Sequence, residues 1–549
     1  MKRSAKLKPV NSDRDILWVF QLAASVSIAS FFYYLQKSDL LLYGDAVAHI
    51  NIARRVFDSR TPGLLQLGTV WLPLPHLLMV PLLTSKFLWQ TGIGGAIPSM
   101  IAYVFSVAGI FRLLRIVVPD SAGPVARFAA WLGTAIFALN PNLIYLQTTA
   151  MTESLYLALF IWTVAFFAGA IRKCRQGDTK RANSSLLRSG LCLFGACLTR
   201  YDGWLLAAVM CVLVVVLAWS RGFAPLRPGA KKLLVLSAAA PALWLTYNAA
   251  VYGNALEFAN GPYSAKAIEQ KTIAPGMPTH PGDHNLRMAF KYYFKSAESN
   301  LAPGRLQWLW VAALLFGTAV VLLFQRKLWP VLLLWIPVPF YMISIAYSGV
   351  PIFLPVWWPH SYYNVRYGIE LLPAFAVLTA IAACGLLNFA ATTRTRIILS
   401  VLFVVVMAAS YAQAWRSGPI SLQEAIVNSH SRGFLERQLA SILHTLPSNS
   451  RVLMYLGDHV GAFQQAGIPL SHTINEGNHR PWKRPSDSDG LWERALDHPS
   501  RYADFVIAFD HDAVATAVNK SELKAVTILR VTGQPEATIY ETLRSNQAR

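Results

Sequence analysis

The chain has few charged residues for its length. Asp, Glu, Lys and Arg make up 14% of its 549 residues, whereas hydrophobic residues make up 54%. About a quarter of the residues in a typical soluble domain are charged, so this composition argues against an ordinary soluble protein. Many apolar runs approach the roughly 20 residues with which a helix crosses a bilayer. The sequence therefore predicts a polytopic α-helical membrane protein.

Acidic residues are especially scarce, with 28 Asp and Glu against 49 Lys and Arg and a formal charge of +21. Residues 416–549 hold 14 side chains of each sign, so the whole positive excess lies in residues 1–415. There it occupies short loops between apolar runs, as in the cytoplasmic loops of membrane proteins. A nucleic-acid-binding protein would concentrate this charge on a soluble face, and we expect no nucleic-acid partner.

Cysteines and nucleotide-binding motifs are also few or missing. The five cysteines lie in or beside apolar runs, and residues 416–549 contain none, so no disulfide framework indicates the compartment of that region. No cysteine spacing resembles a metal-thiolate site. Neither a Walker nor a Rossmann motif is present, which argues against direct use of a nucleotide.

Apolar segments predict about eleven membrane crossings. The basic N-terminus is expected in the cytoplasm, and the apolar run after it is too long for a cleaved signal sequence. An odd number of crossings then places the C-terminus outside the cytoplasm, in a multi-pass protein of the inner (plasma) membrane whose transmembrane domain comprises residues 1–415. The predicted spans are 16–35, 97–118, 126–147, 154–171, a pair within 186–220, 233–252, 306–324, 328–347, 369–390 and 397–415.

The apolar segment 71–89 contains three prolines and has two possible paths. If it crosses the membrane fully, the arginines within 112–127 lie outside the cytoplasm, and Glu153 lies on the membrane face opposite Asp45. If it re-enters or lies along the surface, those arginines are cytoplasmic and Glu153 lies near Asp45. The prolines and the charge bias favour a re-entrant or interfacial segment.

Residues 416–549 differ in character and predict a small extracytoplasmic α/β domain. An amphipathic helix is expected at 422–446 and strands at 451–456, 504–509, 525–531 and 537–542. Several polar residues in this region are interpreted as ordinary loop residues, with contact to an acceptor as the alternative. They are Asp458, His459, Glu476, His479 and Trp482.

The stretch from Tyr43 to Leu77 is too polar to cross a lipid core. Asp45 and His49 are four positions apart and share a helix face, and Arg54 and Asp58 repeat that spacing. An ionisable cluster beside membrane spans is a functional-site hypothesis. The alternative is an amphipathic helix that lies in the interface with solvated charges.

Further polar residues stand immediately beside predicted spans. Glu153 is a candidate acid, or else a helix N-terminal acid in the first turn. Arg200 and Asp202, in RYDGW, predict an anion clamp or else a local ion pair at the interface. Arg366 and Tyr367, in NVRYGIELLP, predict a phosphate-binding position or else interfacial snorkelling.

Taken together, these residues suit a group that is attached to a lipid phosphate. A carboxylate such as Asp45 or Glu153 can take a proton from an acceptor hydroxyl as that hydroxyl attacks an anomeric carbon. His49, Arg54, Arg200, Asp202, Arg366 and Tyr367 are the candidate substrate-binding residues. The arginines can stabilise the negative charge of a departing phosphate. Because the lipid phosphate is itself the leaving group, no nucleotide is needed.

Several of these motifs resemble the GT-C superfamily of integral-membrane glycosyltransferases, in particular the bacterial branch with protein O-mannosyltransferases and the lipid A aminoarabinose transferase. They are GDAVAHINIARRVFDS, QLGTVWLPLPHLL, LNPNLIYLQTTAMTES, LTRYDGW and NVRYGIELLP. The resemblance implies transfer of a hexose or mannose-type sugar from a polyprenyl-phosphate donor, with inversion, on the outer face. It implies that Asp45 is the general base, that Glu153 shapes the same cavity, and that Arg200 and Arg366 hold the donor phosphate.

The sequence departs from this family in two places. The first loop has a single acid before Ala46 instead of an adjacent Asp-Glu pair, and no acidic pair is evident around Glu153. We therefore expect no required metal ion and no other cofactor. The acceptor, which could be a glycan, a lipid or a protein, is not identified by the sequence. The alternatives to a transferase are a non-catalytic transporter of lipid-linked sugars and a binding protein for envelope assembly.

Overall fold

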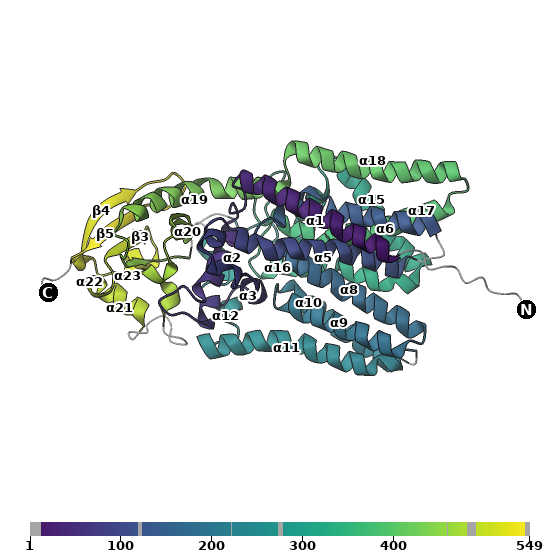
Figure 1. The fold of residues 1–549 in the computed structure, drawn as a ribbon, viewed down its shortest axis with the longest axis horizontal. Coiled ribbons are helices and arrows are strands. Elements are labelled where there is room, and N and C mark those ends of the chain that lie inside the picture. The colour runs from purple at the N-terminus through teal and green to yellow at the C-terminus, as the bar shows by residue number, and fades with distance from the viewer. Residues whose placement is uncertain are drawn as a thin grey trace, which may run out of the picture.

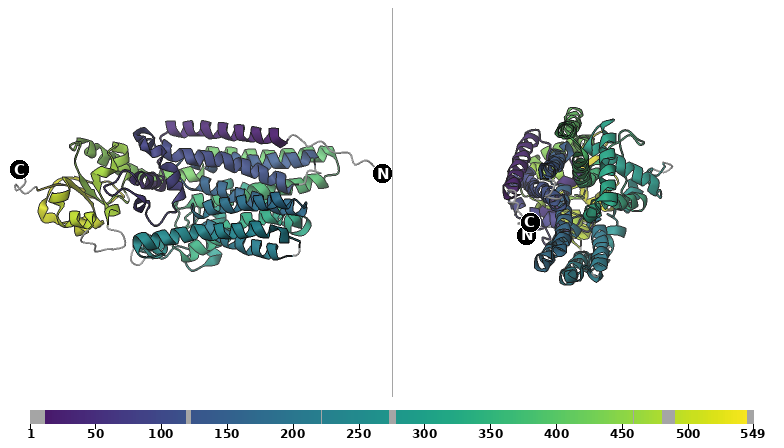
Figure 2. Two further views of the ribbon diagram at one scale, coloured as in Figure 1. Left: turned by 60° about the horizontal axis from the view of Figure 1, so that its bottom comes forward. Right: turned by 90° about the vertical axis from the view of Figure 1, so that its right-hand side faces the viewer.

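The structure, a computed structural model, consists of a helical bundle joined end to end with a smaller region that contains a sheet (Figure 1). It describes residues 12–118, 123–220, 222–272, 278–457, 459–479 and 490–543. The long helices of the bundle run roughly parallel to the long axis of the molecule (Figure 2).

Nine helices in the described part of the chain are long and apolar enough to cross a membrane. Two further helices, α6 (Gly123–Ala138) and α9 (Thr179–Cys197), pack among them where the sequence predicts two more spans, and the total of eleven crossings stays a prediction. The nine are α1 (Ser12–Gln36), α5 (Ile93–Val117), α8 (Glu153–Arg175), α10 (Asp202–Trp219), α11 (Arg227–Tyr252), α15 with η5 (Leu306–Phe324), η6 with α16 (Arg326–Tyr347), η7 with α17 (Val365–Phe389) and α18 (Thr393–Ser417).

The segment 71–89 does not form a membrane-spanning helix. It folds into α3 (Leu74–Met79), η2 (Leu82–Thr84) and α4 (Lys86–Gln90), each too short to cross a bilayer. Its prolines explain the interruptions, because proline lacks an N–H and breaks a helix interior. The segment therefore lies across the end of the bundle beside α2 (Gly44–Arg55), as the second of the two predicted paths requires.

The basic loops gather at the opposite end of the bundle. Arg127 pairs with Asp15 at 2.8 Å, and Arg172 donates to the backbone carbonyls of Arg115 and Ile116 at 3.2 and 3.1 Å. Arg172 is near the end of α8, whereas Glu153 is at its start, so roughly 29 Å of helix separates them. Glu153 therefore lies at the same end of the bundle as α2, and the arginines lie at the other.

Shorter helices cap the α2 end of the bundle. Polar residues and Asn or Gly positions break the apolar pattern there, so these helices are short or amphipathic. They are η1 (Leu64–Leu67), α7 (Pro141–Leu146), α12 (Glu257–Asn260), α13 (Ala265–Thr272) and α14 (Leu286–Leu301).

Beyond α18, the long helix α19 (Ile420–Thr445) leads into a five-stranded sheet with the order β2-β1-β3-β5-β4. β1 pairs in parallel with β2 and β3, whereas β5 pairs antiparallel with β3 and β4. Leu453, Val506 and Trp492 are buried in its core. The strands are β1 (Val452–Met454), β2 (Thr473–Ile474), β3 (Phe505–Phe509), β4 (Leu523–Leu529) and β5 (Ala537–Thr542).

The sheet region is fastened to the α2 end by a closed set of hydrogen bonds. The Asn51 amide donates to Gln464 in α20 (Gly461–Ala466) at 2.7 Å, Gln464 donates to the Trp89 carbonyl at 2.7 Å, and the Trp89 indole donates to Asn51 at 2.9 Å. Asp58 accepts the backbone N–H groups of Leu470 and Ser471 at 3.2 and 3.0 Å. The division of the chain at residue 416 stays a prediction, and it falls within α18.

Candidate active site

Asp45 lies in the first turn of α2, where the partial positive charge of a helix N-terminus favours an acid. Most of the following turn is packed into the protein, including Ala46, Val47, His49 and Ile50. The Asp45 side chain is nevertheless 40% exposed. The helix therefore holds this carboxylate rigidly at the edge of an accessible surface.

Arg366 lies in η7, at the start of the span that continues as α17, and its guanidinium meets three carboxylates. It pairs with Asp45, lies 3.3 Å (Nε to Oε1) from Glu153, and donates through Nη1 to Glu424 at 2.9 Å. The backbone N–H of Arg366 donates to the other oxygen of Glu424 at 3.0 Å. Asp45 and Glu153, which are remote in sequence, therefore meet at one guanidinium.

Arg200 extends this arrangement from the turn between α9 and α10. Its guanidinium lies 3.5 Å from Glu153, 3.0 Å from Glu370 and 3.4 Å from Asp202. The Tyr341 hydroxyl accepts a 2.8 Å hydrogen bond from Arg200 and donates one of 2.8 Å to Glu370. Glu153 thus contacts two guanidinium groups, and each of these groups meets three carboxylates.

Tyr367 separates the two arginines. The guanidinium carbons of Arg200 and Arg366 each lie 4.9 Å from the centre of its ring, and that of Arg366 lies 5.0 Å from the ring of Tyr43. A desolvated cation over an aromatic face gains about 2 kcal/mol. The ring therefore stabilises two cations side by side; its predicted contact with a substrate stays a prediction.

These side chains form one ion-pair cluster, in which a single carboxylate is accessible. The other four carboxylates are at most 1% exposed in their side chains, against 40% for Asp45. A bound molecule can therefore reach Asp45 and not the acids behind it. The ion-pair cluster consists of Asp45, Glu153, Arg200, Asp202, Arg366, Glu370 and Glu424.

Two of the cluster acids escaped the sequence analysis although a signal for each was present. Glu370 stands inside an apolar span, where an ionisable residue is unusual. Glu424 comes a few residues after the last span and was assigned with its helix to the C-terminal domain. The structure shows that α19 begins beside α7 and η7, so its first turn belongs to the membrane-side site.

Arg54 and His49 lie on α2 but outside the ion-pair cluster. Arg54 donates to Asp58 at 2.8 Å and to the carbonyl of Leu83, and its guanidinium carbon lies 4.8 Å from the centre of the Trp89 ring system. These contacts fix the loop after α2. The predicted binding of substrate by Arg54 and His49 stays a prediction.

His49 forms a buried pair with His76. It is 2% exposed, its Nδ1 lies 2.9 Å from Nε2 of His76, and its ring centre lies 4.7 Å from that of Trp71. Burial lowers the pKa of His49 to about 3, and the positive charges of Arg366 and Arg200 act in the same direction. Burial also lowers the pKa of His76 well below its usual value.

Acidification from pH 7 to pH 5 is expected to destabilise the fold through this histidine pair. Both rings stay neutral in the folded protein, whereas in the unfolded chain they bind protons below their ordinary pKa of about 6.5. Their contribution to stability is thus complete above that pKa and falls toward pH 3, by roughly 2 kcal/mol per histidine at pH 5. Unfolding midpoints at the two pH values measure this loss. The variant with both His49→Gln and His76→Gln should lose less stability than the wild type between pH 7 and pH 5. An equal loss in the two proteins would contradict the expectation.

Gly368 lets the backbone that carries Arg366 approach α14 closely. A Cβ atom at this position would lie 2.4 Å from the backbone carbon of Ser296 and 2.5 Å from the backbone nitrogen of Ala297. Both atoms belong to a helix backbone that cannot rotate away. Only glycine fits here, and η7 therefore depends on it for its position.

Gly368→Ala is expected to push η7 away from α14 and to pull Arg366 out of the ion-pair cluster. Overpacking of this kind costs about 1–3 kcal/mol, so the unfolding midpoint in detergent should fall. Gly385→Ala in α17 is the matched control, because its Cβ would meet nothing closer than 3.7 Å. Similar midpoints for the two variants would show that η7 tolerates the displacement.

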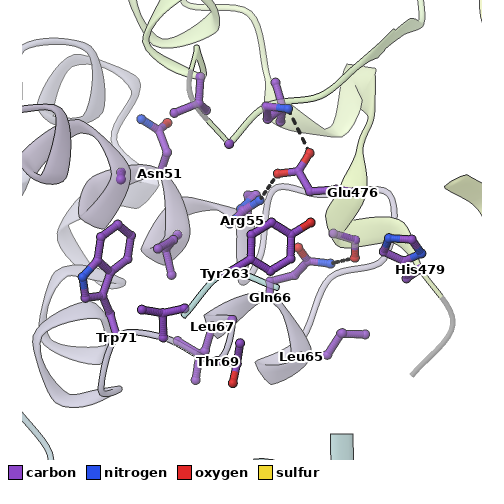
Figure 3. Close-up of a pocket in the computed structure, with 18 of the residues that line it drawn as sticks. Asn51, Arg55, Leu65, Gln66, Leu67, Thr69, Trp71, Tyr263, Glu476 and His479 are labelled. Carbon is purple, nitrogen blue, oxygen red and sulfur yellow. Dashed lines mark hydrogen bonds and ion pairs between the residues drawn. The ribbon is translucent and has the colours of Figure 1, made fainter. Parts of the chain in front are cut away.

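A cavity of about 260 Å³ opens beside α2 (Figure 3). We call it the loop–sheet cavity, because α2 and the loop through Trp71 form one side and residues 455–479 form the other. Ala48 lines it three positions after Asp45, so the acid and the cavity lie on neighbouring sides of α2.

Two of the C-terminal residues noted in the sequence, Glu476 and His479, line the loop–sheet cavity, and the choice between loop residues and contact with an acceptor stays a prediction. His459 is buried with its ring centre 4.1 Å from that of Phe509. Asp458 and Trp482 lie outside the described residues.

Comparison with protein-family models and with curated proteins finds no match. Solved structures are similar over nearly the whole chain. ArnT from Cupriavidus metallidurans bound to undecaprenyl phosphate aligns with 96% of this chain and 99% of its own, with a TM-score of 0.54 and 12% identity. ArnT in the apo state aligns with 95% of this chain and 97% of its own, with a TM-score of 0.54 and 13% identity. The Archaeoglobus fulgidus oligosaccharyltransferase in the apo form aligns with 90% of this chain and 69% of its own, with a TM-score of 0.47 and 11% identity.

The chain has a GT-C fold. The fold predicted from the sequence motifs is thereby confirmed, including a multi-pass helical membrane part and a small sheet near the C-terminus. The GT-C likeness covers the sheet region as well as the bundle, whereas the motifs in the sequence cover only residues 1–415. At such low identity the likeness establishes the fold, and the activity is argued from the site.

Proposed function

We propose that the protein is a membrane glycosyltransferase that moves a sugar from a polyprenyl-phosphate donor to an acceptor hydroxyl. The observation that carries this proposal is the exposed Asp45 carboxylate, which Arg366 holds next to Glu153. ArnT, which shares the fold, is solved with undecaprenyl phosphate, and this supports a lipid-phosphate donor.

In the proposed reaction, Asp45 accepts the proton of the acceptor hydroxyl as its oxygen bonds to the anomeric carbon. The bond from that carbon to the phosphate oxygen breaks, and the polyprenyl phosphate leaves with the bonding electron pair. Attack on the side opposite the leaving group inverts the configuration. A general base of this kind supplies about 10²–10⁴-fold in rate.

The arginines act first as positioning groups in this proposal. In the structure Arg366 and Arg200 contact carboxylates, so their N–H groups are directed to Asp45, Glu153, Glu424 and Glu370. Direct binding of the donor phosphate by either arginine would require some of these contacts to exchange. Because charge develops on the phosphate oxygen as the bond breaks, such an exchange would stabilise the transition state.

The proposed orientation follows from the distribution of charge. The basic loops gather at the end of the bundle remote from the ion-pair cluster, and loops of this kind face the cytoplasm. The N-terminus is then cytoplasmic, and the site and the sheet region lie outside, in an inner (plasma) membrane. A hexose or mannose-type sugar is proposed from the family resemblance, and the acceptor is a glycan, a lipid or a protein.

Transfer of label tests this function against the non-catalytic alternatives. Purified protein in lipid vesicles is supplied with undecaprenyl phosphates that carry radiolabelled hexoses, together with envelope material as acceptor. A transferase moves label into the acceptor and releases undecaprenyl phosphate. A transporter or an assembly protein returns the donor unchanged, and this result with every hexose would overturn the proposal.

We expect the transfer to need no divalent metal ion. Asp45, Glu153 and Glu424 all contact Arg366, so their charges are already compensated by a cation. A hard cation such as Mg²⁺ needs carboxylate oxygens that can coordinate it. The rate of transfer should therefore be unchanged in excess EDTA. Loss of activity in EDTA and recovery with Mg²⁺ or Mn²⁺ would contradict this expectation.

A further inference from the structure

The loop–sheet cavity lies beyond the ends of the spans, between the first loop and the C-terminal region. Figure 3 shows Arg55 from α2 paired with Glu476 from the C-terminal region, with Tyr263 in front of Arg55 and Trp71 to one side. Because two distant parts of the chain form its walls, the cavity exists only where the sheet region is seated on the bundle. Its volume of about 260 Å³ suits a group of one or two sugar rings more than a large lipid.

The charged groups of this cavity compensate one another. Nη1 of Arg55 lies 3.6 Å from Oε1 of Glu476, and the other oxygen of Glu476 accepts the Leu456 N–H at 2.8 Å. Among the described residues that line the cavity, Arg55 is the only arginine and Glu476 the only glutamate, and the two form an ion pair. An anionic ligand would have to break this pair to obtain a cation, whereas an uncharged ligand would leave it intact.

Two residues that line the cavity also contain buried polar atoms, one an acceptor and the other a donor. The Gln66 amide nitrogen donates to Thr61 and to the Gly477 carbonyl at 2.9 Å, so the amide, 2% exposed, is fixed. Its Oε1 and the Nε of Arg55 are buried without a hydrogen-bond partner within the described part of the chain. The first is an acceptor and the second a donor. A hydroxyl group that reached these two atoms on binding would serve both, whereas a phosphate dianion would serve only the donor.

The remaining walls are apolar and aromatic. Trp71, Tyr252, Tyr263 and Tyr455 contribute rings, and Leu65 and Leu67 contribute apolar side chains. Mixed sites of this type, mainly apolar with a few placed polar groups, bind molecules that have apolar faces and polar edges. A pyranose or furanose ring has this character, since its C–H faces are apolar and its hydroxyls lie at the edge.

We infer that the loop–sheet cavity binds the acceptor, and that the acceptor is an uncharged carbohydrate whose hydroxyl is presented to Asp45. This inference rests on the proposed transferase function and adds the chemical class of its second substrate. Ala48, which lines the cavity, comes three positions after Asp45 on α2, so the cavity and the accessible acid lie on neighbouring sides of one helix. A phosphorylated or carboxylated acceptor would meet the Arg55–Glu476 pair and the Gln66 oxygen, and both oppose it.

Binding of saccharides, measured apart from transfer, tests the inference. The full-length protein in lipid nanodiscs, without donor, is titrated with neutral di- and trisaccharides of mannose, glucose, galactose and arabinose, and with the same sugars as 1-phosphates. Saturation-transfer NMR reports binding of each sugar. At least one neutral sugar is expected to bind, and its 1-phosphate should bind at least tenfold more weakly. Equal or tighter binding of the phosphate, or no binding by any neutral sugar, would overturn the inference.

Cavity variants locate the binding. Tyr263→Ala, which removes a ring, and Leu65→Trp, which fills space, should each weaken the binding of that sugar at least tenfold. Tyr347→Ala is the control, because Tyr347 is an exposed tyrosine outside the cavity. Elution volume and unfolding midpoint check that each variant is folded. Unchanged affinity in both cavity variants would place the sugar elsewhere. Competition by undecaprenyl phosphate at the same site would assign the cavity to the donor lipid and overturn the inference.

Asp45→Asn separates a failure of this inference from a failure of the proposed function. Asp45 is outside the lining of the cavity, so the variant should bind the neutral sugar with the affinity of the wild type while transfer is lost. Binding of the sugar without transfer by the wild-type protein would refute the transferase and leave the carbohydrate site. Transfer of label to an acceptor without binding of any neutral sugar would refute the inference alone.

Discussion

Asp45→Asn is expected to lower the rate of sugar transfer about 10²–10⁴-fold. The amide keeps the size of the side chain but cannot accept the proton of the acceptor hydroxyl. Because the other carboxylates of the ion-pair cluster are at most 1% exposed, none of them can replace Asp45 at the surface. The measurement is the initial rate of transfer from labelled undecaprenyl-phosphate sugar in the purified variant.

Asp39→Asn is the matched control for this experiment. Asp39 lies between α1 and α2, and the hydrogen bond from the Tyr145 hydroxyl goes to its backbone carbonyl, which the substitution leaves in place. The control should transfer sugar at the rate of the wild type. Asp45→Glu should keep part of the activity, since the carboxylate is retained but displaced. An Asp45→Asn protein that is folded and transfers at more than a tenth of the wild-type rate would exclude Asp45 as the base.

Arg366→Met is expected to be the most destabilising single substitution in the ion-pair cluster. The thioether fills part of the volume, but the negative charges of Glu153 and Glu424 are left buried without this cation. Removing one partner of a buried ion pair costs about 3–5 kcal/mol. The unfolding midpoint in detergent should fall accordingly, and transfer should be lost because Asp45 is no longer held.

A second substitution distinguishes this charge effect from a loss of packing. Adding Glu424→Gln to Arg366→Met removes one of the uncompensated charges, so the double variant should recover part of the lost stability. Arg416→Met near the end of α18 is the control, because Arg416 is exposed and its replacement should change the midpoint little. If the double variant is less stable than Arg366→Met, charge compensation does not govern this site.

The membrane part could be predicted well because each span has a strong local signal. Runs of apolar residues bounded by basic loops define the spans, and the three prolines after Val70 identified the segment that does not cross. The strand β2 was missed because it has two residues, too few to show an alternating pattern. Its position is determined by pairing with β1, and this pairing cannot be recognised from the two residues of the strand.

Most residues of the candidate site could be predicted from the sequence, but the ion pairs between them could not. Asp45, Glu153, Arg200 and Arg366 were identified because each stands beside an apolar span, where a charge needs an explanation. Neighbouring charges along the chain do not reveal that one guanidinium binds three acids from three other helices. Glu424 was overlooked for this reason, since its partner lies in a different part of the fold.

The position of Glu424 limits how the two parts of this protein can be separated. The residue comes after the final span, yet its carboxylate closes the cluster around Arg366. The polypeptide after α18 is therefore no detachable appendage, and a chimera that borrows the sheet of a relative has to keep the native chain through the first turns of α19. A graft made at the membrane boundary would remove an acid from the ion-pair cluster while seeming to exchange only the exterior.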